Sequence, residues 1–301
     1  ACRIDRLAAQ AKTLGFKALA ITDHGNMHGI IDFYKAMRKE GIRPILGVEA
    51  YLAPDRHSRT DKRRFHLVLL AKNNEGYINL CRMVSFANLE GFYHKPRIDK
   101  ELLRRHHEGL IALSACLSGE IPMAILDNRP DEARRLAAEY AEIMGPDNFY
   151  LEIQKNGIPR QERVNAELVK IARELNLPLI ATNDVHYLNS DDYDPHDTLL
   201  CIGRAQSKSD PSRSGYDTDS LYLRSSDEMR SLFSDYPEAV KNTVRIAERC
   251  NVELTLGEPM LPNFEVPEGY TQASWFRKEA AEGLEKRLAA LPYEVDRRVY
   301  E

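Results

Sequence analysis

The sequence predicts an α/β fold in which a mostly parallel sheet closes into a barrel. Short apolar runs typical of buried strands alternate along the chain with amphipathic segments typical of helices. An apolar run followed by Asp and His occurs twice, at Ala18–His24 and at Leu179–His186. Parallel α/β folds place their chemistry at the carboxyl ends of the strands. We therefore expect a barrel whose strand ends carry a functional site.

The expected elements alternate in the order that a parallel sheet requires. Gly15, Gly41 and Gly145 are suited to end helices, and Asn73 and Asp131 are suited to cap helix starts. In chain order we expect strands over 17–22, 44–51, 65–71, 110–116, 149–153 and 179–182, and helices over 4–14, through 32–37, over 73–88, from 99, and over 131–144, 161–175, 227–233, 237–250 and 274–288.

The pattern changes after His186. An acidic, turn-like stretch, a polar loop rich in Ser, Asp and Gly, and a linker with three prolines follow at 190–197, 207–220 and 259–269. We expect two domains over 1–257 and 258–301, the second being the linker and the start of a further domain.

Both ends of the sequence have the character of interior segments. A helix that opens an α/β chain usually follows a strand, so the helix over 4–14 predicts at least one strand before residue 1. The helix over 274–288 has the apolar content of a domain's opening helix. We therefore expect the chain to be part of a longer protein.

Charge and cysteine content exclude several function classes. The formal charge of −4 gives no support to nucleic-acid binding by overall charge, so any such contact has to be local. Five cysteines without regular spacing do not make a disulfide framework and favour a reducing cytoplasm. No signal segment or apolar run of membrane-spanning length occurs. A cytoplasmic protein without a membrane partner is expected.

Six side chains at or beside predicted strand ends are candidate metal ligands: His24, Glu49, His66, Cys116, Asp184 and His186. Imidazole, carboxylate and thiolate together suit zinc, with manganese or iron as alternatives where sulfur ligands are few. Six ligands exceed what one tetrahedral ion needs, so two or more ions are expected. Clustered ions with a water between them are the equipment for hydrolysis of phosphoesters. Asp23 is a candidate for orienting one of these ligands.

Each candidate also has a purely structural interpretation. A single strand-end Asp or His is more often a turn residue than a ligand, and Cys116 alone is most simply a small buried residue. His66 fits least well, because it begins its apolar run instead of ending it. The hypothesis depends on the joint occurrence of all six residues near strand edges.

Basic residues near the predicted strand ends are candidates for phosphate binding. Tyr93, Lys95 and Arg97 lie in one such loop, and Arg recognises phosphate in bidentate fashion. The polar loop over 55–64 carries five Lys or Arg, and we interpret Arg56–Arg64 as a solvated loop with the alternative of contact to a phosphate backbone.

With these residues in hand, the chain resembles the PHP domain (polymerase and histidinol phosphatase) family. Within that family it is most similar to the amino-terminal domain of bacterial DNA polymerase III alpha subunits, and Pro259–Phe264 looks like the passage from that domain into the polymerase palm. The resemblance rests on Leu19–Asn26, Gly47–Tyr51, His66–Asn73, Tyr93–Asp99, Ser114–Glu120 and Thr182–Tyr187.

This resemblance implies a distorted seven-stranded (β/α) barrel that holds up to three ions with nine ligands. The six candidates match the family's ligand positions, and among them Asp184, His186 and His24 are the implied catalytic residues. The other three ligands, a His-x-His pair and an acidic residue or His soon after it, are implied to precede residue 1. Some members have lost the ligands and keep the domain as a scaffold, and the presence of all six here argues against that.

The implied activity is metal-dependent 3′–5′ exonuclease hydrolysis, which would proofread for an attached DNA-directed DNA polymerase. The implied partners are primer-template DNA through the parent polymerase, the sliding clamp and other replicase subunits. Two alternatives stay open. One is a free-standing phosphatase acting on a small phosphomonoester, against which the trailing linker and helix count. The other is a catalytically inactive scaffold that stabilises the polymerase and docks an exonuclease subunit.

Overall fold

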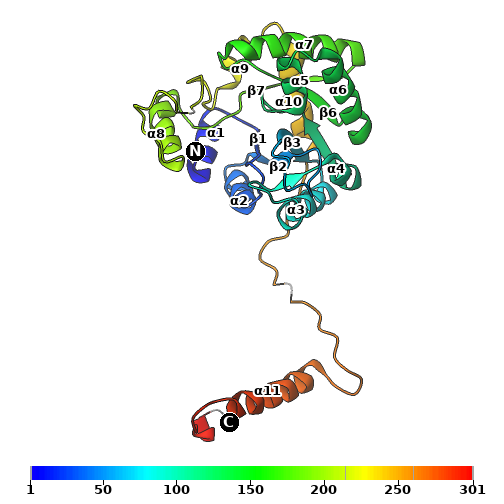
Figure 1. Cartoon of the computed structure of the whole chain (residues 1–301), viewed down its shortest axis with the longest axis vertical. Coiled ribbons are helices and arrows are strands. Elements are labelled where there is room, and N and C mark those ends of the chain that lie inside the picture. The colour runs from blue at the N-terminus through cyan, green and yellow to red at the C-terminus, as the bar shows by residue number, and fades with distance from the viewer. Residues whose placement is uncertain (1, 214, 260, 300–301) are drawn as a thin grey trace. The chain divides into compact units, whose positions relative to one another are not determined.

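The computed structural model describes residues 2–213, 215–259 and 261–299. The chain divides into two compact units, of which the first ends at Leu254 and the second begins at Thr255. The first unit contains the sheet, and Figure 1 shows its strands at the centre with helices around them.

One sheet of seven strands forms the frame of the first unit. Its strands are β1 (Ala18–Ile21), β2 (Arg43–Leu52), β3 (Phe65–Ala71), β4 (Arg97–Ile98), β5 (Leu110–Leu113), β6 (Phe149–Gln154) and β7 (Leu179–Thr182). The order is β1-β2-β3-β5-β6-β7, with β4 paired to β2. No pairing joins β1 to β7 among the described residues, so the curled sheet is a distorted barrel with one open side.

Strand β3 runs antiparallel to both of its neighbours, whereas the other strand pairs are parallel. The prediction of an α/β barrel with a mostly parallel sheet is confirmed, and the reversal of β3 is the exception. Strands β2, β5 and β6 are buried along almost their whole length because helices cover their outer side.

The helices of the first unit lie mainly between consecutive strands. They are α1 (Ile4–Thr13), α2 (Ile30–Lys39), α3 (Asn74–Leu89), α4 (Lys100–His106), α5 (Glu120–Leu126), α6 (Pro130–Met144), α7 (Pro159–Leu175), α8 (Tyr193–Gly203), α9 (Ser226–Leu232) and α10 (Pro237–Arg249), with a short 3-10 turn at Ser190–Asp192.

Local chemistry explains several helix starts and ends. Asn73 caps α3 by accepting the N–H of Gly76 at 2.9 Å, as the sequence predicts. Asp131 does not cap α6, because the helix begins at Pro130, which suits the first helical position since it lacks a backbone N–H. Asp99 caps α4 by accepting the N–H of Leu102 at 2.9 Å.

Several elements were not expected from the sequence. The predicted turn-like stretch over 190–197 is wrong, because most of it belongs to the 3-10 turn and to α8. Helix α5 follows Gly119, and β4 is a two-residue strand in a segment that the sequence predicts as loop. The predicted strand over 110–116 ends early, at Leu113, because the backbone turns at Ala115 with φ +63°.

The second unit contains α11 (Gln272–Ala289), capped by Thr271, and a 3-10 turn at Arg297–Val299. Helix α11 contains the predicted helix over 274–288 and buries none of its residues. The predicted linker has neither helix nor strand in its described residues, and Met260 lies outside them. No described helix combines the length and the apolar character needed to cross a membrane.

Candidate metal centre

His24 and Glu49 are brought together by an extension of the β1-β2 pairing. Beyond Ile21 the backbone continues as a parallel bridge between His24 and Glu49, in which Gly25 N–H donates to the Glu49 carbonyl at 2.9 Å. As a result, Nδ1 of His24 lies 3.2 Å from Oε2 of Glu49. Gly25 has φ +65°, and a Cβ there would lie 3.0 Å from Tyr51 and Pro96, so only glycine fits.

His66 joins this pair because β3 is reversed. The start of an antiparallel strand lies beside the end of its neighbour, and the register pairs Tyr51 with His66 and Glu49 with Val68. Glu49 and His66 are therefore diagonal neighbours on one face of the sheet. Nδ1 of His66 lies 2.7 Å from Oε1 of Glu49. The residue that fitted least well in the sequence thus lies at the same end of the barrel as the others.

Cys116 enters the site from the turn after β5. The carbonyl of Ser118 accepts the N–H of His66 at 2.9 Å, which fixes this turn against the start of β3. The Cys116 Sγ lies 3.5 Å from Nδ1 of His66 and 3.9 Å from Oε1 of Glu49.

Asp184 and His186 reach the site from the end of β7. Asp184 has φ +51°, a left-handed conformation that is costly for most residues and that concentrates at functional sites. The buried Asn183 holds this turn by donating to the carbonyls of Ser220 and Tyr222 at 3.1 and 2.7 Å. Nδ1 of His186 lies 2.7 Å from the Asp184 carbonyl, which can only accept, so Nδ1 is the donor of this hydrogen bond.

The carboxylates and the thiol interact electrostatically with the rest of the cluster. Burial tends to raise the pKa of Glu49, but the hydrogen bond from His66 and the positive charge available on His24, His66 and His186 outweigh burial and lower it. Burial raises the pKa of Asp184, and the charge of Glu49 adds to the rise while the imidazoles oppose it.

The same burial raises the pKa of the Cys116 thiol far above its ordinary value, with the Asp184 and Glu49 charges adding to it. Without a cation, the cluster therefore contains a protonated thiol beside crowded carboxyl groups. A bound cation would relieve this crowding.

The donor set fits a divalent metal ion. Among the described residues, ligand atoms of His24, Glu49 and His66 all lie within 4.8 Å of one another. Cys116 contacts His66 and Glu49 of this group, and Asp184 and His186 act on it electrostatically. Two carboxylates, three imidazoles and one thiol suit zinc and its neighbours among the transition metals.

The Asp23 side chain forms no hydrogen bond with the imidazole of His24 in the described part of the chain, although the charges of His24 and His28 act on its carboxylate. Its carboxylate faces Gly29 instead, with Oδ2 3.3 Å from where a Cβ of that residue would lie. Its backbone carbonyl accepts the N–H of Glu49 at 3.1 Å, so Asp23 contributes to the strand pairing that positions the ligands.

Of the two predicted phosphate-binding side chains, only Lys95 is exposed to solvent, and it lies beside the cluster. Its Nζ is 5.7 Å from the centre of the Tyr51 ring, and that ring stacks on His24 at 5.9 Å. The prediction for Arg97 is wrong. Arg97 is 1% exposed, and its guanidinium donates to the carbonyls of Gly91, Asp61, Arg56 and Ser58.

Arg56 also departs from the sequence interpretation of a solvated loop. It is 4% exposed and forms an ion pair with the buried Asp99 at 2.9 Å. Arg56 and Arg97 are therefore internal supports of the loop over 53–64, whereas Lys62, Arg63 and Arg64 are exposed.

Three further residues of the site were missed at the sequence level. Glu152 on β6 is buried, accepts from Thr182 and Gln154, and leaves Oε2 without a hydrogen-bond partner. Burial raises its pKa to about 7, and the charges of nearby Asp184 and Glu49 contribute to the rise. A carboxylate inside an otherwise apolar strand was the signal for it.

The other two are tyrosines. Tyr51 lies two residues after Glu49 and contacts the rings of His24 and His66. Tyr216 comes from the polar loop over 207–220, and its ring lies 4.6 Å from that of His186. Burial raises the pKa of Tyr216 to about 12, and the charge of Asp184 adds to it. Nothing in the sequence pattern of that loop points to Tyr216.

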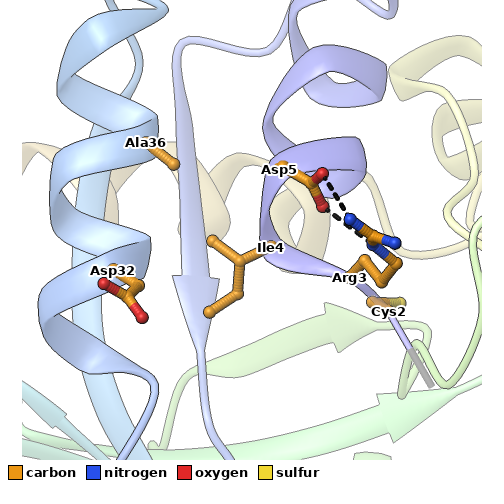
Figure 2. A pocket seen from close by; sticks show the side chains of 6 residues that line it. All are labelled: Cys2, Arg3, Ile4, Asp5, Asp32 and Ala36. Carbon is orange, nitrogen blue, oxygen red and sulfur yellow. Dashed lines mark hydrogen bonds and ion pairs between the residues drawn. The ribbon is translucent and has the colours of Figure 1, made fainter.

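A hollow of about 510 Å³ elsewhere on the first unit is unrelated to this cluster. Figure 2 shows it between the starts of α1 and α2, where Ile4 points between the two helices and Arg3 pairs with Asp5. Its lining contains none of the six candidate ligands.

Comparison with known proteins agrees with this architecture. The family described as "PHP domain" matches residues 1–156. The DNA polymerase III subunit alpha of Treponema pallidum is 44% identical over 99% of this chain and 26% of its own length. Those of Borreliella burgdorferi and Thermus aquaticus are 43% and 44% identical over 100% and 90% of the chain, and over 27% and 23% of their own lengths.

The chain thus spans about a quarter of the length of these curated relatives. A solved structure from Bifidobacterium adolescentis aligns with 77% of this chain and 91% of its own at 15% identity and a TM-score of 0.42, a likeness too distant to carry weight. The family match covers more than half of the chain, and its segment includes the first four of the six candidate ligands, His24 to Cys116. The chain belongs to the PHP domain family.

Proposed function

We propose that this chain is the PHP domain of a bacterial DNA polymerase III alpha subunit and that it hydrolyses phosphodiester bonds at the 3′ end of DNA. The observation that supports the activity most directly is the group of His24, Glu49 and His66, with Cys116 in contact with it. Similarity to polymerase alpha subunits over 99% and 100% of this chain supports the assignment to that parent.

Two or three divalent ions, with zinc first and manganese or iron as alternatives, are the proposed cofactors. His24, Glu49, His66, Cys116, Asp184 and His186 would hold them. When bound, such ions activate water and neutralise charge on the attacked phosphate and on the leaving oxygen.

The side chains have distinct proposed roles in this reaction. Glu49 accepts from Nδ1 of His66 at 2.7 Å and so fixes the orientation of that imidazole. Asp184, whose pKa is raised by burial, is the proposed acceptor of a proton from the attacking water. Lys95 is placed beside Tyr51 to neutralise the charge of the phosphate. His24 and His186 complete the proposed catalytic set.

The proposal extends to the parent protein. In it, residues 1–257 are the hydrolytic domain and residues 258–301 lead toward the polymerase palm. Nucleotidyl transfer would be carried out by the remainder of a DNA-directed DNA polymerase in the cytoplasm. Primer-template DNA, the sliding clamp and other replicase subunits are the proposed partners.

Elemental analysis combined with a nuclease assay tests this proposal. The wild-type protein, Asp184→Asn and His186→Ala would be compared on a 5′-labelled DNA strand and on a small aryl phosphate. Asn tolerates the left-handed backbone at position 184, so that variant removes charge with little strain. Glu142→Gln, at an exposed carboxylate on α6, is the matched control.

Bound metal and metal-dependent shortening from the 3′ end, both diminished in the two variants and unchanged in the control, would support the nuclease. Hydrolysis of the aryl phosphate without action on DNA would replace it with a phosphomonoesterase. A metal-free protein without hydrolysis would leave only a scaffold.

A further inference from the structure

Two loops beside the metal centre present exposed cations and aromatic rings together. One is the loop over 53–64 between β2 and β3, and the other is the loop over 91–97 before β4. From the second loop Phe92, His94 and Lys95 face solvent, and from the first Lys62 and Arg64 do. We call these five side chains the platform.

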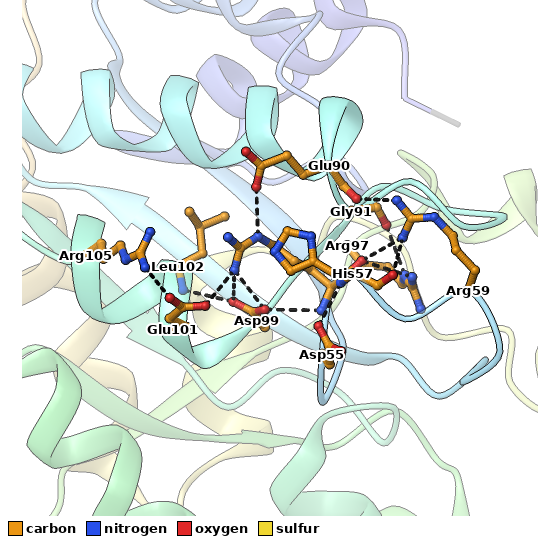
Figure 3. A network of polar contacts seen from close by, with 11 residues as sticks. Asp55, His57, Arg59, Glu90, Gly91, Arg97, Asp99, Glu101, Leu102 and Arg105 are labelled. Atoms are coloured by element: carbon orange, nitrogen blue, oxygen red, sulfur yellow. Dashed lines mark hydrogen bonds and ion pairs between the residues drawn. The ribbon is translucent and has the colours of Figure 1, made fainter.

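The two loops are fixed to each other by a buried guanidinium. Arg97 donates to the Gly91 carbonyl at 3.1 Å within its own loop and to the Asp61 carbonyl at 2.8 Å in the other. Figure 3 shows Arg97 donating to the carbonyl of Gly91 and Arg59 donating to the carbonyl of the neighbouring Glu90. A Cβ on Gly91 would lie 1.9 Å from the carbonyl oxygen of Arg97, so the close approach needs glycine. The two loops that carry the platform are therefore held in a fixed arrangement relative to each other before a ligand binds.

Contacts with the candidate metal site give the platform its position. Pro96 packs against Gly25, the neighbour of His24. Lys95 lies over the Tyr51 ring at 5.7 Å, and Tyr51 stacks on His24. The positive charge of Arg64 also acts on the Tyr51 hydroxyl, where it opposes the rise in pKa that burial and Glu49 cause.

The cations of the platform differ from the other basic residues of the same loops. Arg63 is paired with Asp61 at 2.7 Å, and Arg59 donates to backbone carbonyls. By contrast, Lys62, Arg64 and Lys95 have no carboxylate partner among the described residues. Three exposed cations without a carboxylate partner, on two loops that Arg97 joins, form a local positive field on a chain whose formal charge is −4.

The aromatic side chains of the platform, Phe92 and His94, are exposed to solvent, so they contribute little to the core of the fold. Phe92 is 54% exposed, although burial would stabilise the fold. His94 sits at the tip of a tight turn with φ +61°, which directs its ring beside that of Tyr93 at 4.4 Å. The Tyr93 N–H donates to the Lys95 carbonyl at 3.1 Å and closes this turn.

We propose that the platform binds a single-stranded polynucleotide and leads its end into the metal centre. Cations that follow a phosphate backbone, interleaved with rings on which bases stack, are the features of sequence-tolerant single-strand binding. Exposed rings between the cations find no use on a duplex, whose bases are already stacked. The delivery of the strand's end to the metal centre rests on the proposed function. The binding of the strand by the platform does not.

Fluorescence anisotropy in EDTA tests binding without catalysis. The probes are a labelled oligothymidylate, a duplex of equal length, and an oligomer of abasic sugar phosphates that keeps the charge but lacks bases. The variants are Lys62→Gln/Arg64→Gln and Phe92→Ala/His94→Asn, where Asn tolerates the left-handed turn. Lys17→Gln/Lys39→Gln is the control, because it also removes two exposed charges. Lys17 precedes the start of β1 and Lys39 ends α2, whereas His24 lies between the end of β1 and the start of α2.

The charge variant should lower the slope of log affinity against log salt by about 1.4, since each single-strand phosphate contact contributes about 0.7. The aromatic variant should weaken oligothymidylate binding roughly tenfold and leave the abasic oligomer unaffected. Equal loss in the control, or duplex binding as tight as single-strand binding, would overturn the inference.

The two proposals fail in different ways. Single-strand binding that depends on the platform, in a protein that never cleaves DNA, would remove the nuclease and keep the binding surface. DNA cleavage with an unchanged Michaelis constant and unchanged binding in both platform variants would keep the nuclease and remove the binding surface.

Discussion

Nδ1 of His66 lies 2.7 Å from Oε1 of Glu49, although one residue begins its strand and the other lies near the end of its own. The antiparallel register of β2 and β3 produces this contact and places both side chains on one face. The relationship ties the first three candidate ligands into one group, and the predictions on metal binding follow from it.

Removing either member of this pair should weaken metal binding. Glu49→Gln and His66→Ala each delete one proposed ligand, so the affinity for the metal should fall by at least about 100-fold, the upper end of what outer-shell changes cost. Isothermal titration of the metal-free protein with zinc measures it. Glu142→Gln should bind as the wild type does, and wild-type affinity in Glu49→Gln would remove Glu49 from the ligand set.

Metal binding should release a proton from Cys116. Burial raises the pKa of this thiol, so it is protonated in the metal-free protein at neutral pH, whereas a metal ligand has to be thiolate. Calorimetry in two buffers of different ionisation enthalpy counts the protons. Cys116→Ala should release about one fewer than the wild type, and an equal count would show that the thiol is not a ligand.

Glu152 should make the stability of the metal-free protein fall with rising pH. Its pKa is raised by folding from 4.5 to about 7, so the stabilisation is complete below 4.5 and is lost as the pH rises through 7. Urea unfolding in EDTA at pH 5 and pH 8 should show about 2.5 kcal/mol less stability for the wild type at pH 8, at 1.36 kcal/mol per pKa unit.

The isosteric variant Glu152→Gln serves as the comparison, because it keeps the shape and removes the titration. Its stability should change much less over the same pH range. Parallel pH profiles for the two proteins would show that Glu152 does not carry the effect.

Arg97 should be important for stability and not for phosphate contact. Arg97→Met leaves four carbonyls without their donor, which should lower the free energy of unfolding by roughly 3 kcal/mol after partial hydration of the loop. Urea unfolding measures the loss. Arg63→Gln, at an exposed ion pair in the loop over 53–64, should change the free energy of unfolding much less than Arg97→Met does. Equal losses would mean that burial of Arg97 contributes little.

Much of the fold was predictable because the apolar runs are short and clearly bounded. The predicted strands over 65–71 and 179–182 match β3 and β7 in both bounds. Helix α8 was missed because its opening residues, Asp194 and Pro195 among them, are also typical of turns, although both suit the first turn of a helix. The direction of β3 was also not predictable, because the alternation of side chains along a strand is the same whether the strand runs parallel or antiparallel to its neighbour.

The candidate site was predictable only where ligands lie at strand ends. His24 and Asp184 follow apolar runs directly, so topology alone brings them to one edge. Tyr216 depends on how a long polar loop folds back toward His186, which no local pattern records. Arg97 shows the opposite error, because burial changed a residue with phosphate-binding chemistry into an internal support.

The ladder between β2 and β3 has a consequence for how this protein tolerates variation. Six consecutive cross-strand partners, from Gly47–Leu70 to Leu52–Phe65, fix the spacing of Glu49 and His66. Where the Arg56 and Arg97 contacts are kept, the hairpin segment beyond that ladder can gain or lose residues at small entropic expense, since loop closure depends only weakly on length. Relatives can therefore reshape the entrance to the barrel while the distance between these two side chains stays the same.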